Sequence, residues 1–173
     1  MPKNFDYLYR SNEENHQLTK EAIETALLQL LEKKTLDEIN VTELVKRAGV
    51  GRNSFYRNYM SKADILKKMH EERFSLLASY NIDRYSADKV AGLLTIFDFI
   101  KQNKAFYKVL IKEGLQNFLE EEIYRYQPNS GKETNKMTYY KNCFISAGMA
   151  KLLIEWLKND CSDSPEIFID VFK

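Results

Sequence analysis

The feature that most constrains this chain is its scarcity of residues that interrupt helices. Its 173 residues include only six glycines and three prolines. Between these breakers, apolar residues recur every three or four positions, which is the period of an amphipathic helix. No segment shows the strict alternation of apolar and polar residues that indicates a half-buried strand. The chain is therefore predicted to be all-α.

The same periodicity predicts the order of the helices, about nine in all. The segments expected to be helical are about 16–33, 42–48, 52–59, 61–80, 89–103, 104–113, 115–126, 134–159 and a short helix after Pro165. The pattern breaks over 81–88, and the polar run 127–132 is the clearest loop. Residues 1–14 are expected to form a flexible arm, residues 1–62 a first domain, and residues 63–173 a second helical domain.

Composition excludes several classes of protein. No run of about 18 apolar residues exists, so no membrane span is expected, and the polar N-terminus is unlike a signal peptide. The two cysteines form no CxxC pair, and the two histidines lack partners at metal-ligand spacing, so neither a metal nor another cofactor is expected. Without a nucleophile elbow or a phosphate-binding glycine loop, an enzyme is not expected. The absence of a secretion signal and the low number of cysteines predict a cytoplasmic protein.

Charge is concentrated in one short segment. Residues 46–68 contain seven basic residues and one acidic residue, a net charge of +6, while the whole chain carries +1. The rest of the chain is therefore acidic, at −5. This asymmetry is typical of a module that binds a polyanion, although a short basic run is also compatible with a solvated helix face. Lys67 and Lys68 are interpreted as solvated charges.

The basic segment contains a helix, a tight glycine turn and a second helix. Thr42 is a suitable N-cap for the first helix, and Gly49 suits the left-handed residue that ends it. In the second helix, at about 100° per residue, one arc of roughly 140° holds Arg, Asn and Tyr side chains. The residues on this arc are Arg52, Asn53, Tyr56 and Arg57, and the rest of the helix surface holds Phe55 and Tyr59 beside Ser54 and Asn58. Arg and Asn can bond base edges, so a helix-turn-helix that binds DNA is predicted.

These residues resemble a known family. The run from Val41 to Leu66, which includes Ala48-Gly49-Val50, Phe55-Tyr56, Tyr59 and Ser61-Lys62, is similar to the DNA-binding signature of TetR/AcrR-type bacterial regulators. The resemblance covers about residues 16–70 and implies a three-helix DNA-binding domain followed by a helical ligand-binding and dimerisation domain. The C-terminal region is similar to a type found in low-GC Gram-positive members, some of which are linked to control of dihydroxyacetone kinase.

The resemblance implies roles for individual residues. Thr42, Tyr56, Tyr59 and Lys62 would hold phosphates, and Arg52, Asn53 and Ser54 would face bases, with Arg57 on the same outward arc. For Tyr59, packing in the core is an equal alternative. The chain departs from the family pattern at three positions. Gly51 replaces Ser or Thr at the cap of the recognition helix, Asn53 replaces a common Gly, and Met60 replaces Phe. Glycine is tolerated as an N-cap, so the helix is expected to form, whereas Asn53 adds a polar side chain that would alter the preferred operator.

Two further sites are hypotheses for the second domain. Aromatic residues that could line an effector cavity, or equally form ordinary core, are Phe97, Phe106, Tyr107, Phe118 and Tyr140. Residues that could form a dimer seam, or equally pack within one chain, are Ala147, Ala150, Ile154, Trp156, Leu157 and Phe168.

The sequence thus predicts a homodimeric repressor that is released from a palindromic double-stranded DNA operator by a small-molecule effector. The alternative is a protein of the same fold that acts as a coactivator through protein–protein contact, without binding DNA itself.

Overall fold

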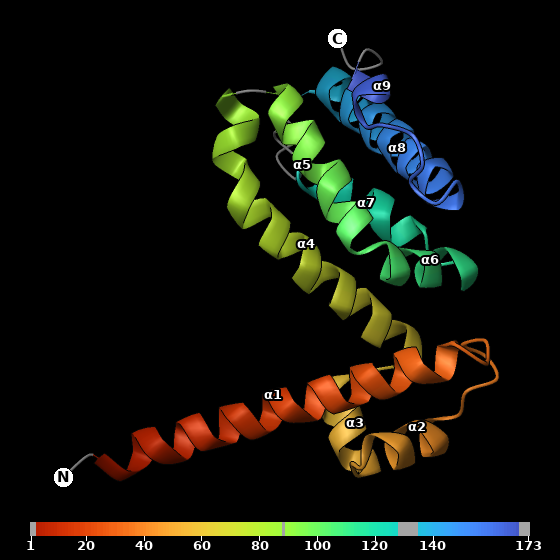
Figure 1. The fold of residues 1–173 in the computed structure, drawn as a ribbon. Coiled ribbons are helices and arrows are strands. Elements are labelled where there is room, and N and C mark those ends of the chain that lie inside the picture. Colours follow the sequence, from red (N-terminus) through yellow and green to blue (C-terminus); the bar gives the residue numbers. More distant parts are fainter. Residues whose placement is uncertain (1–2, 88, 128–134, 170–173) are drawn as a thin grey trace. The chain divides into compact units, whose positions relative to one another are not determined.

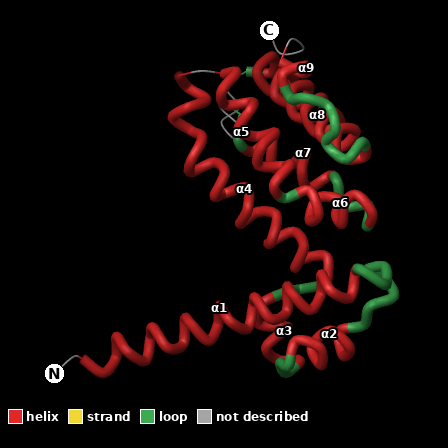
Figure 2. Tube along the Cα trace, in the orientation of Figure 1, coloured by secondary structure: helices red, strands yellow, loops and turns green. Residues whose placement is uncertain are grey.

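The computed structural model describes residues 3–87, 89–127 and 135–169, which form helices joined by turns and loops (Figures 1 and 2). No strand occurs among these residues, so the predicted all-α fold is confirmed. The helices of the described ranges, in chain order, are α1 (Lys3–Leu31), α2 (Val41–Ala48), α3 (Arg52–Asn58), α4 (Lys62–Ala87), α5 (Lys89–Gln102), α6 (Lys104–Lys112), α7 (Asn117–Arg125), α8 (Lys136–Lys158) and α9 (Glu166–Ile169). The expected loop at 127–132 lies outside the described residues except for Gln127.

Three helix limits differ from the prediction. The helix α1 begins at Lys3, so it includes residues 3–14, which precede the helix predicted from about residue 16. The N-cap of α2 is Asn40, whose side-chain Oδ1 accepts a hydrogen bond from the Glu43 N–H at 2.9 Å, so Thr42 is already inside the helix. The helix α4 continues to Ala87, through the segment where the apolar pattern breaks. A helix whose residues need not bury a continuous face can persist without that pattern.

The chain divides into two compact units, Met1–Met69 and His70–Lys173. The division falls inside α4, so this helix belongs to both units. No helix in the described part of the chain is long and apolar enough to cross a membrane.

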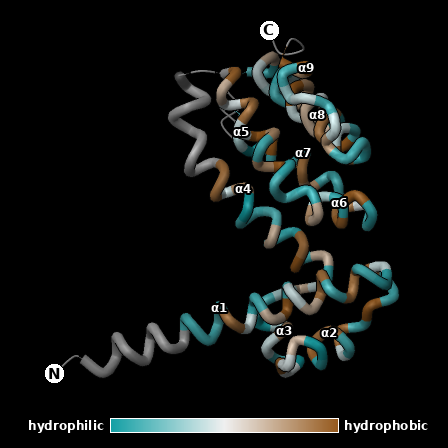
Figure 3. The backbone as a smooth tube through the Cα atoms, in the orientation of Figure 1, coloured by the Kyte–Doolittle hydropathy of each residue, from teal (hydrophilic) through white to brown (hydrophobic). Residues whose placement is uncertain are grey.

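The first unit (Met1–Met69) is a small helical bundle in which α1 packs on α2 and α3. Its core is formed by apolar side chains that recur at helical spacing, and Figure 3 shows how hydrophobic and hydrophilic residues alternate along these helices. The fully buried residues include Ile23, Leu27, Ile39, Leu44, Phe55, Ile65 and Leu66. This core fixes which side of α3 faces inward.

The second unit (His70–Lys173) is organised around α8, which packs against α5, α6 and α7, while α9 packs against α5. Three aromatic rings join α5, α8 and α9: Phe97 meets Trp156 edge to face at 5.1 Å and stacks on Phe168 at 5.4 Å. The Trp156 indole N–H donates to the Asp163 carbonyl at 2.9 Å, which satisfies the polar atom of this buried ring.

Candidate nucleic-acid interface

The turn between α2 and α3 is set by two glycines with different conformations. Gly49 has φ 69°, in the left-handed region, and ends α2 there as predicted. Its neighbour Val50 donates its N–H to the Val45 carbonyl at 3.0 Å, which completes the helix cap. Gly51 has extended backbone, with φ −79° and ψ 154°, and caps α3 without a side-chain hydrogen bond. Any residue can adopt that conformation, so the backbone does not require glycine here. Because glycine has no side-chain oxygen, it holds the N-terminal end of α3 less firmly than a Ser or Thr cap would.

The orientation of α3 agrees with the predicted arc. The Phe55 side chain is 0% exposed and anchors the helix in the core, whereas Tyr56 is 61% exposed. Arg52, Asn53 and Arg57 are also exposed, and Ser54 is half-buried. The outward face therefore presents two guanidinium groups, an amide and a phenol, which together can bond base edges and phosphates.

Two hydroxyl groups hold the arginines of this face. The Arg52 guanidinium donates a hydrogen bond to the Thr42 hydroxyl, which joins α3 to α2. The Arg57 Nη2 donates to the Ser54 hydroxyl at 3.3 Å within α3. A guanidinium has five N–H donors, so each arginine keeps most of its donors for a ligand while its position is fixed. Thr42 and Ser54 thus orient the two arginines.

Two residues expected on the interface are bonded to other parts of the first unit. The Tyr59 side chain is 1% exposed, and its hydroxyl donates to the Glu24 carboxylate of α1 at 2.8 Å. Tyr59 is therefore a core residue in this structure, in agreement with the alternative that its ring packs in the core. The Lys62 ammonium donates to the carbonyls of Leu36 and Ile39, in the loop between α1 and α2. It ties this loop to the start of α4.

Lys68, which was expected to be a solvated charge, makes contacts that the sequence does not indicate. Its ammonium lies 2.6 Å from the Asn58 carbonyl, 3.4 Å from the Asp64 carboxylate and 5.3 Å from the centre of the Tyr59 ring. Asn58 is ten positions earlier in a different helix, so no local pattern relates the two residues.

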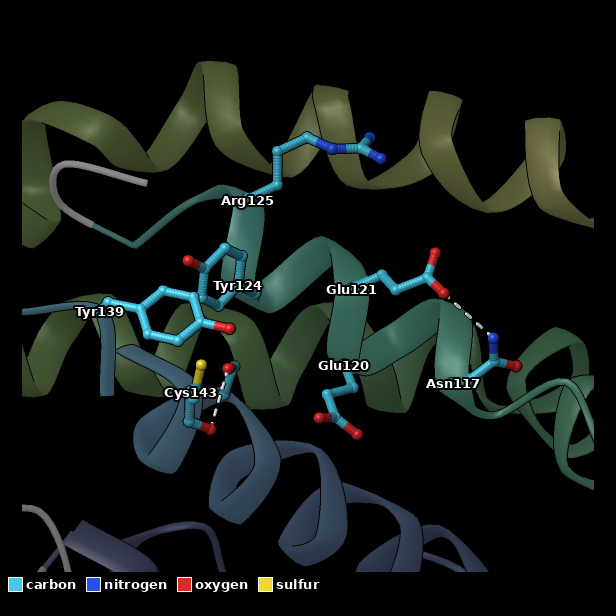
Figure 4. Close-up of a pocket in the computed structure, with 8 residues that line it drawn as sticks. Asn117, Glu120, Glu121, Tyr124, Arg125, Tyr139 and Cys143 are labelled. Carbon is cyan, nitrogen blue, oxygen red and sulfur yellow. Dashed lines mark hydrogen bonds between the residues drawn. The ribbon is translucent and has the colours of Figure 1, made fainter. Parts of the chain in front are cut away.

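The second unit contains an open groove between α7 and α8 of about 570 Å³ (Figure 4). Its lining is polar and aromatic, and comprises Asn117, Glu120, Glu121, Tyr124, Arg125, Tyr139, Cys143 and Ser146. The Tyr124 and Tyr139 rings meet edge to face at 6.3 Å. The Arg125 guanidinium is bonded to the Glu122 carboxylate at 2.8 Å, which balances its charge. The sequence feature that could have indicated this site is the recurrence of Asn117, Glu121 and Tyr124 at helical spacing, which places them on one face of α7.

None of the five aromatic residues predicted for an effector cavity lines this groove. Phe97, Phe106 and Tyr107 are buried in the core, Phe118 is half-buried, and Tyr140 is 65% exposed on α8. The Phe106 ring instead lies under the Arg73 guanidinium at 4.4 Å. The buried positions of Phe97, Phe106 and Tyr107 agree with the alternative that they form ordinary core, because aromatic side chains at helical spacing indicate a packed face without distinguishing a cavity from a core.

The predicted dimer seam is also divided by the fold. Ala150, Trp156 and Leu157 are buried within this chain, Ile154 and Phe168 are half-buried, and only Ala147 is exposed. The buried three are therefore unavailable for a seam in this conformation. Other exposed apolar residues of α8 include Met137, Tyr140 and Phe144, which share a helical face with Ala147.

His70 is a buried polar residue of the second unit. Its side chain is 1% exposed, and its ring Nε2 lies 3.0 Å from the Phe118 carbonyl, which makes Nε2 the protonated nitrogen. Nδ1 is buried without a hydrogen-bond partner among the described residues. The pKa of His70 is lowered to about 4, chiefly by burial and also by the Arg125 and Arg73 charges, while the Phe118 hydrogen bond and Glu121 oppose this shift. No group of three or more metal-ligating side chains occurs in the described ranges.

Two family profiles match the chain. Residues 23–69 match that of the bacterial regulatory proteins of the tetR family, and residues 90–173 match that of a transcriptional regulator C-terminal region. Among curated proteins, the chain is 24% identical over 103 residues to the HTH-type dhaKLM operon transcriptional activator DhaS of Lactococcus lactis subsp. lactis (strain IL1403). That match covers 58% of this chain and 54% of the relative, so it spans about half the relative's length.

Two solved structures have a similar fold. The dihydroxyacetone kinase operon activator DhaS has a TM-score of 0.57 at 17% identity, over 87% of this chain and 89% of that one. NalD, the secondary repressor of the MexAB-OprM multidrug efflux pump in Pseudomonas aeruginosa, has a TM-score of 0.50 at 14% identity, over 89% and 91% of the two chains. At these identities the likeness concerns the fold alone. With its helix-turn-helix and both profiles matched in order, the chain belongs to the TetR family of regulators, with an N-terminal DNA-binding domain and a helical C-terminal domain.

Proposed function

We propose that this chain is a homodimeric repressor that binds a near-palindromic operator and is released by a small molecule, in the cytoplasm. Residues 1–62 bind the DNA, and residues 63–173 bind the effector and the second copy. The observation that carries the DNA-binding role is the outward face of α3, on which Arg52, Asn53, Tyr56 and Arg57 are exposed while Phe55 anchors the helix. In a dimer, two such helices enter successive major grooves of the operator.

Selection of bound duplexes from random DNA tests this function. We expect a recovered sequence with two-fold symmetry, and an affinity that falls steeply as salt rises because phosphate contacts release counterions. The control is the same selection with a chain in which Arg52 and Arg57 are both alanine. Absence of any bound duplex at low salt contradicts the proposal, and favours a protein that acts only by contacting another regulator.

Replacing Arg52 by alanine is expected to weaken binding to the selected operator by about 1–3 kcal/mol and to relax the preference at one base pair of each half-site. The reason is that Arg52 is exposed on α3 and oriented by Thr42. Fluorescence anisotropy with the operator and its single-base variants measures both effects. Lys101→Ala, which removes one positive charge from the exposed surface of α5, is the matched control. An unchanged base preference in Arg52→Ala excludes base reading by this residue.

The homodimer is supported by an exposed apolar stripe on α8, which we define as Met137, Tyr140, Phe144 and Ala147. Phe144 is 81% exposed and Met137 77%. These residues recur at three- and four-residue spacing, so they share one face of the helix. Next to the stripe, Gly148 has only open space where a Cβ would stand, so another helix can approach closely. A second copy covering this stripe would remove a large apolar surface from water.

Replacing Phe144 by alanine is expected to weaken dimer association about tenfold, because a large aromatic ring loses its contact with the partner. Sedimentation equilibrium over a range of protein concentrations measures the dissociation constant. Leu76→Ala removes another exposed apolar side chain, on α4, and should leave association unchanged. A wild-type chain that stays monomeric, or equal association of both variants, contradicts this dimer surface.

Release by an effector is supported by the groove between α7 and α8, whose volume of about 570 Å³ lies in the range of small-molecule sites (Figure 4). Glu120 and Glu121 line it without an ion-pair partner among the described residues, so a cationic ligand fits its charge. A ligand acts through its different affinities for the DNA-bound and free conformations. Loss of operator binding on addition of the ligand is the measurement that identifies it.

A second candidate function is transcription activation, which the similarity to the activator DhaS favours. Repression and activation require the same operator contacts and differ in what the bound dimer does to transcription. A reporter gene placed behind the selected operator separates them. Deletion of the gene that encodes this chain raises reporter expression for a repressor and lowers it for an activator.

A further inference from the structure

The C-terminal end of the recognition helix is held by one ammonium group. Lys68, in α4, donates from Nζ to the Asn58 carbonyl at 2.6 Å, and Asn58 is the last residue of α3. The last carbonyls of a helix have no partner within it, and a cation there also interacts favourably with the helix dipole. Lys68 therefore caps α3 from a different helix.

This cap matters because α3 is short. It has seven residues, and a helix of that length depends on its surroundings for its conformation and direction. At its N-terminal end, Gly51 supplies no side-chain hydrogen bond. In its middle, Phe55 anchors it through apolar packing, which restrains rotation of the helix less than directed bonds do. At its C-terminal end, the Asn58 side chain donates to the Ser54 carbonyl within the helix at 2.7 Å, and Lys68 supplies the directed bond from another helix.

The ammonium is itself fixed by a network that joins three helices. The Asp64 carboxylate lies 3.4 Å from Lys68 Nζ and accepts the Met60 N–H at 2.8 Å. The Tyr59 ring lies 5.3 Å below the ammonium, and its hydroxyl is bonded to Glu24 of α1. The segment that leaves α3 is thus held on both sides by α1 and α4. Lys68 is half-buried, and its charge is directed into this network.

We infer that Lys68 is a positioning residue for operator recognition, which fixes the direction of α3 by capping its C-terminal end and does not contact phosphate. The inference rests on the proposed DNA binding by α3. Without this cap, α3 can change direction, which weakens its contacts with the bases of the operator. The contacts between the basic surface and the phosphates of any duplex remain. The predicted signature is therefore a loss of specificity without a loss of electrostatic binding.

Lys68→Met and Lys68→Arg test this role, with Lys67→Met as the matched control. Lys67 is the preceding residue of α4 and makes no hydrogen bond or ion pair within the described part of the chain. We expect Lys68→Met to weaken binding to the selected operator about tenfold. Binding to a scrambled duplex and the slope of log affinity against log salt should stay as in the wild type. Lys68→Arg should restore most of the operator affinity, and Lys67→Met should keep its preference for the operator.

Two outcomes overturn the inference. A similar loss on both duplexes, with the salt slope reduced by about one, identifies Lys68 as a phosphate contact. Unchanged operator affinity shows that α3 needs no cap.

Hydrogen–deuterium exchange of amides 52–60 gives a readout without DNA. Exchange of these amides should accelerate in Lys68→Met while the core amides of α1 keep their protection. If the wild type binds no duplex, the proposed function fails, and the exchange result still decides whether Lys68 holds α3. Uniformly accelerated exchange in Lys68→Met would mean general unfolding. Lys68→Gln, which keeps a polar N–H donor but removes the positive charge at the end of α3, is then the variant used in place of Lys68→Met.

Discussion

Replacing Phe55 by alanine is expected to lower the free energy of unfolding of the first unit by about 3–5 kcal/mol. The Phe55 ring is fully buried, and it meets the Tyr59 ring at 6.2 Å. Its removal loses apolar burial and leaves a cavity between α3 and the rest of the unit. Small domains have stabilities of about 5–15 kcal/mol, so this loss is a large part of the total. We therefore expect operator binding to be lost with it.

The two units can be followed separately in one urea titration. Trp156 is the only tryptophan and lies in the second unit, so its fluorescence reports that unit, while circular dichroism reports helices of both. Phe55→Ala should shift the part of the dichroism transition that reports the first unit to lower urea. The fluorescence transition, which reports the second unit, should change little. Tyr56→Ala, which removes the adjacent but exposed ring, is the control and should change stability by less than about 1 kcal/mol. Equal shifts for both variants would contradict the assignment of Phe55 as the anchor of α3.

Acidification from pH 6.5 to pH 4 is expected to destabilise the second unit by up to about 3 kcal/mol through His70 alone. Burial lowers the pKa of His70 from 6.5 to about 4. Between these values the unfolded chain binds a proton at this residue and the folded chain does not. Stability at this site is therefore complete above pH 6.5 and falls as the pH drops towards 4. Nδ1 is buried without a hydrogen-bond partner, so a proton placed there would also lack an acceptor.

The variant His70→Gln isolates this contribution from that of the carboxylates. Its amide can still donate to the Phe118 carbonyl, but it does not titrate. Urea titrations followed by Trp156 fluorescence, at pH values from 4 to 7.5, should show a weaker pH dependence in this variant than in the wild type. His16→Gln, at the exposed histidine of α1, should keep the wild-type dependence. If His70→Gln follows the wild-type curve, protonation of this buried ring does not limit stability.

Local signals in the sequence were sufficient for the recognition helix. Gly49 ended α2 as predicted because only a residue tolerant of positive φ fits there, and the 100° step of a helix placed Phe55 inward with Arg52, Asn53, Tyr56 and Arg57 outward. Asn40 took the N-cap role expected of Thr42, since Asn is at least as good a cap and stood two residues earlier. These features depend on residues near one another in the chain.

Features that depend on distant residues needed the tertiary structure. Tyr59 lies in the core with its hydroxyl bonded to the Glu24 carboxylate, and the Lys68 ammonium is bonded to the carbonyl of Asn58 at the end of α3. On α8, the sequence marked apolar residues on more than one face, and the packing of α5, α6 and α7 decided that Trp156 and Leu157 are covered while Phe144 is exposed. The sequence by itself determined the helices, the turn and the outward residues of α3, because periodicity and backbone preferences are local. Which helix covers each face, and where each long charged side chain finds its partner, was decided only by tertiary packing, because those contacts join residues that no local pattern relates.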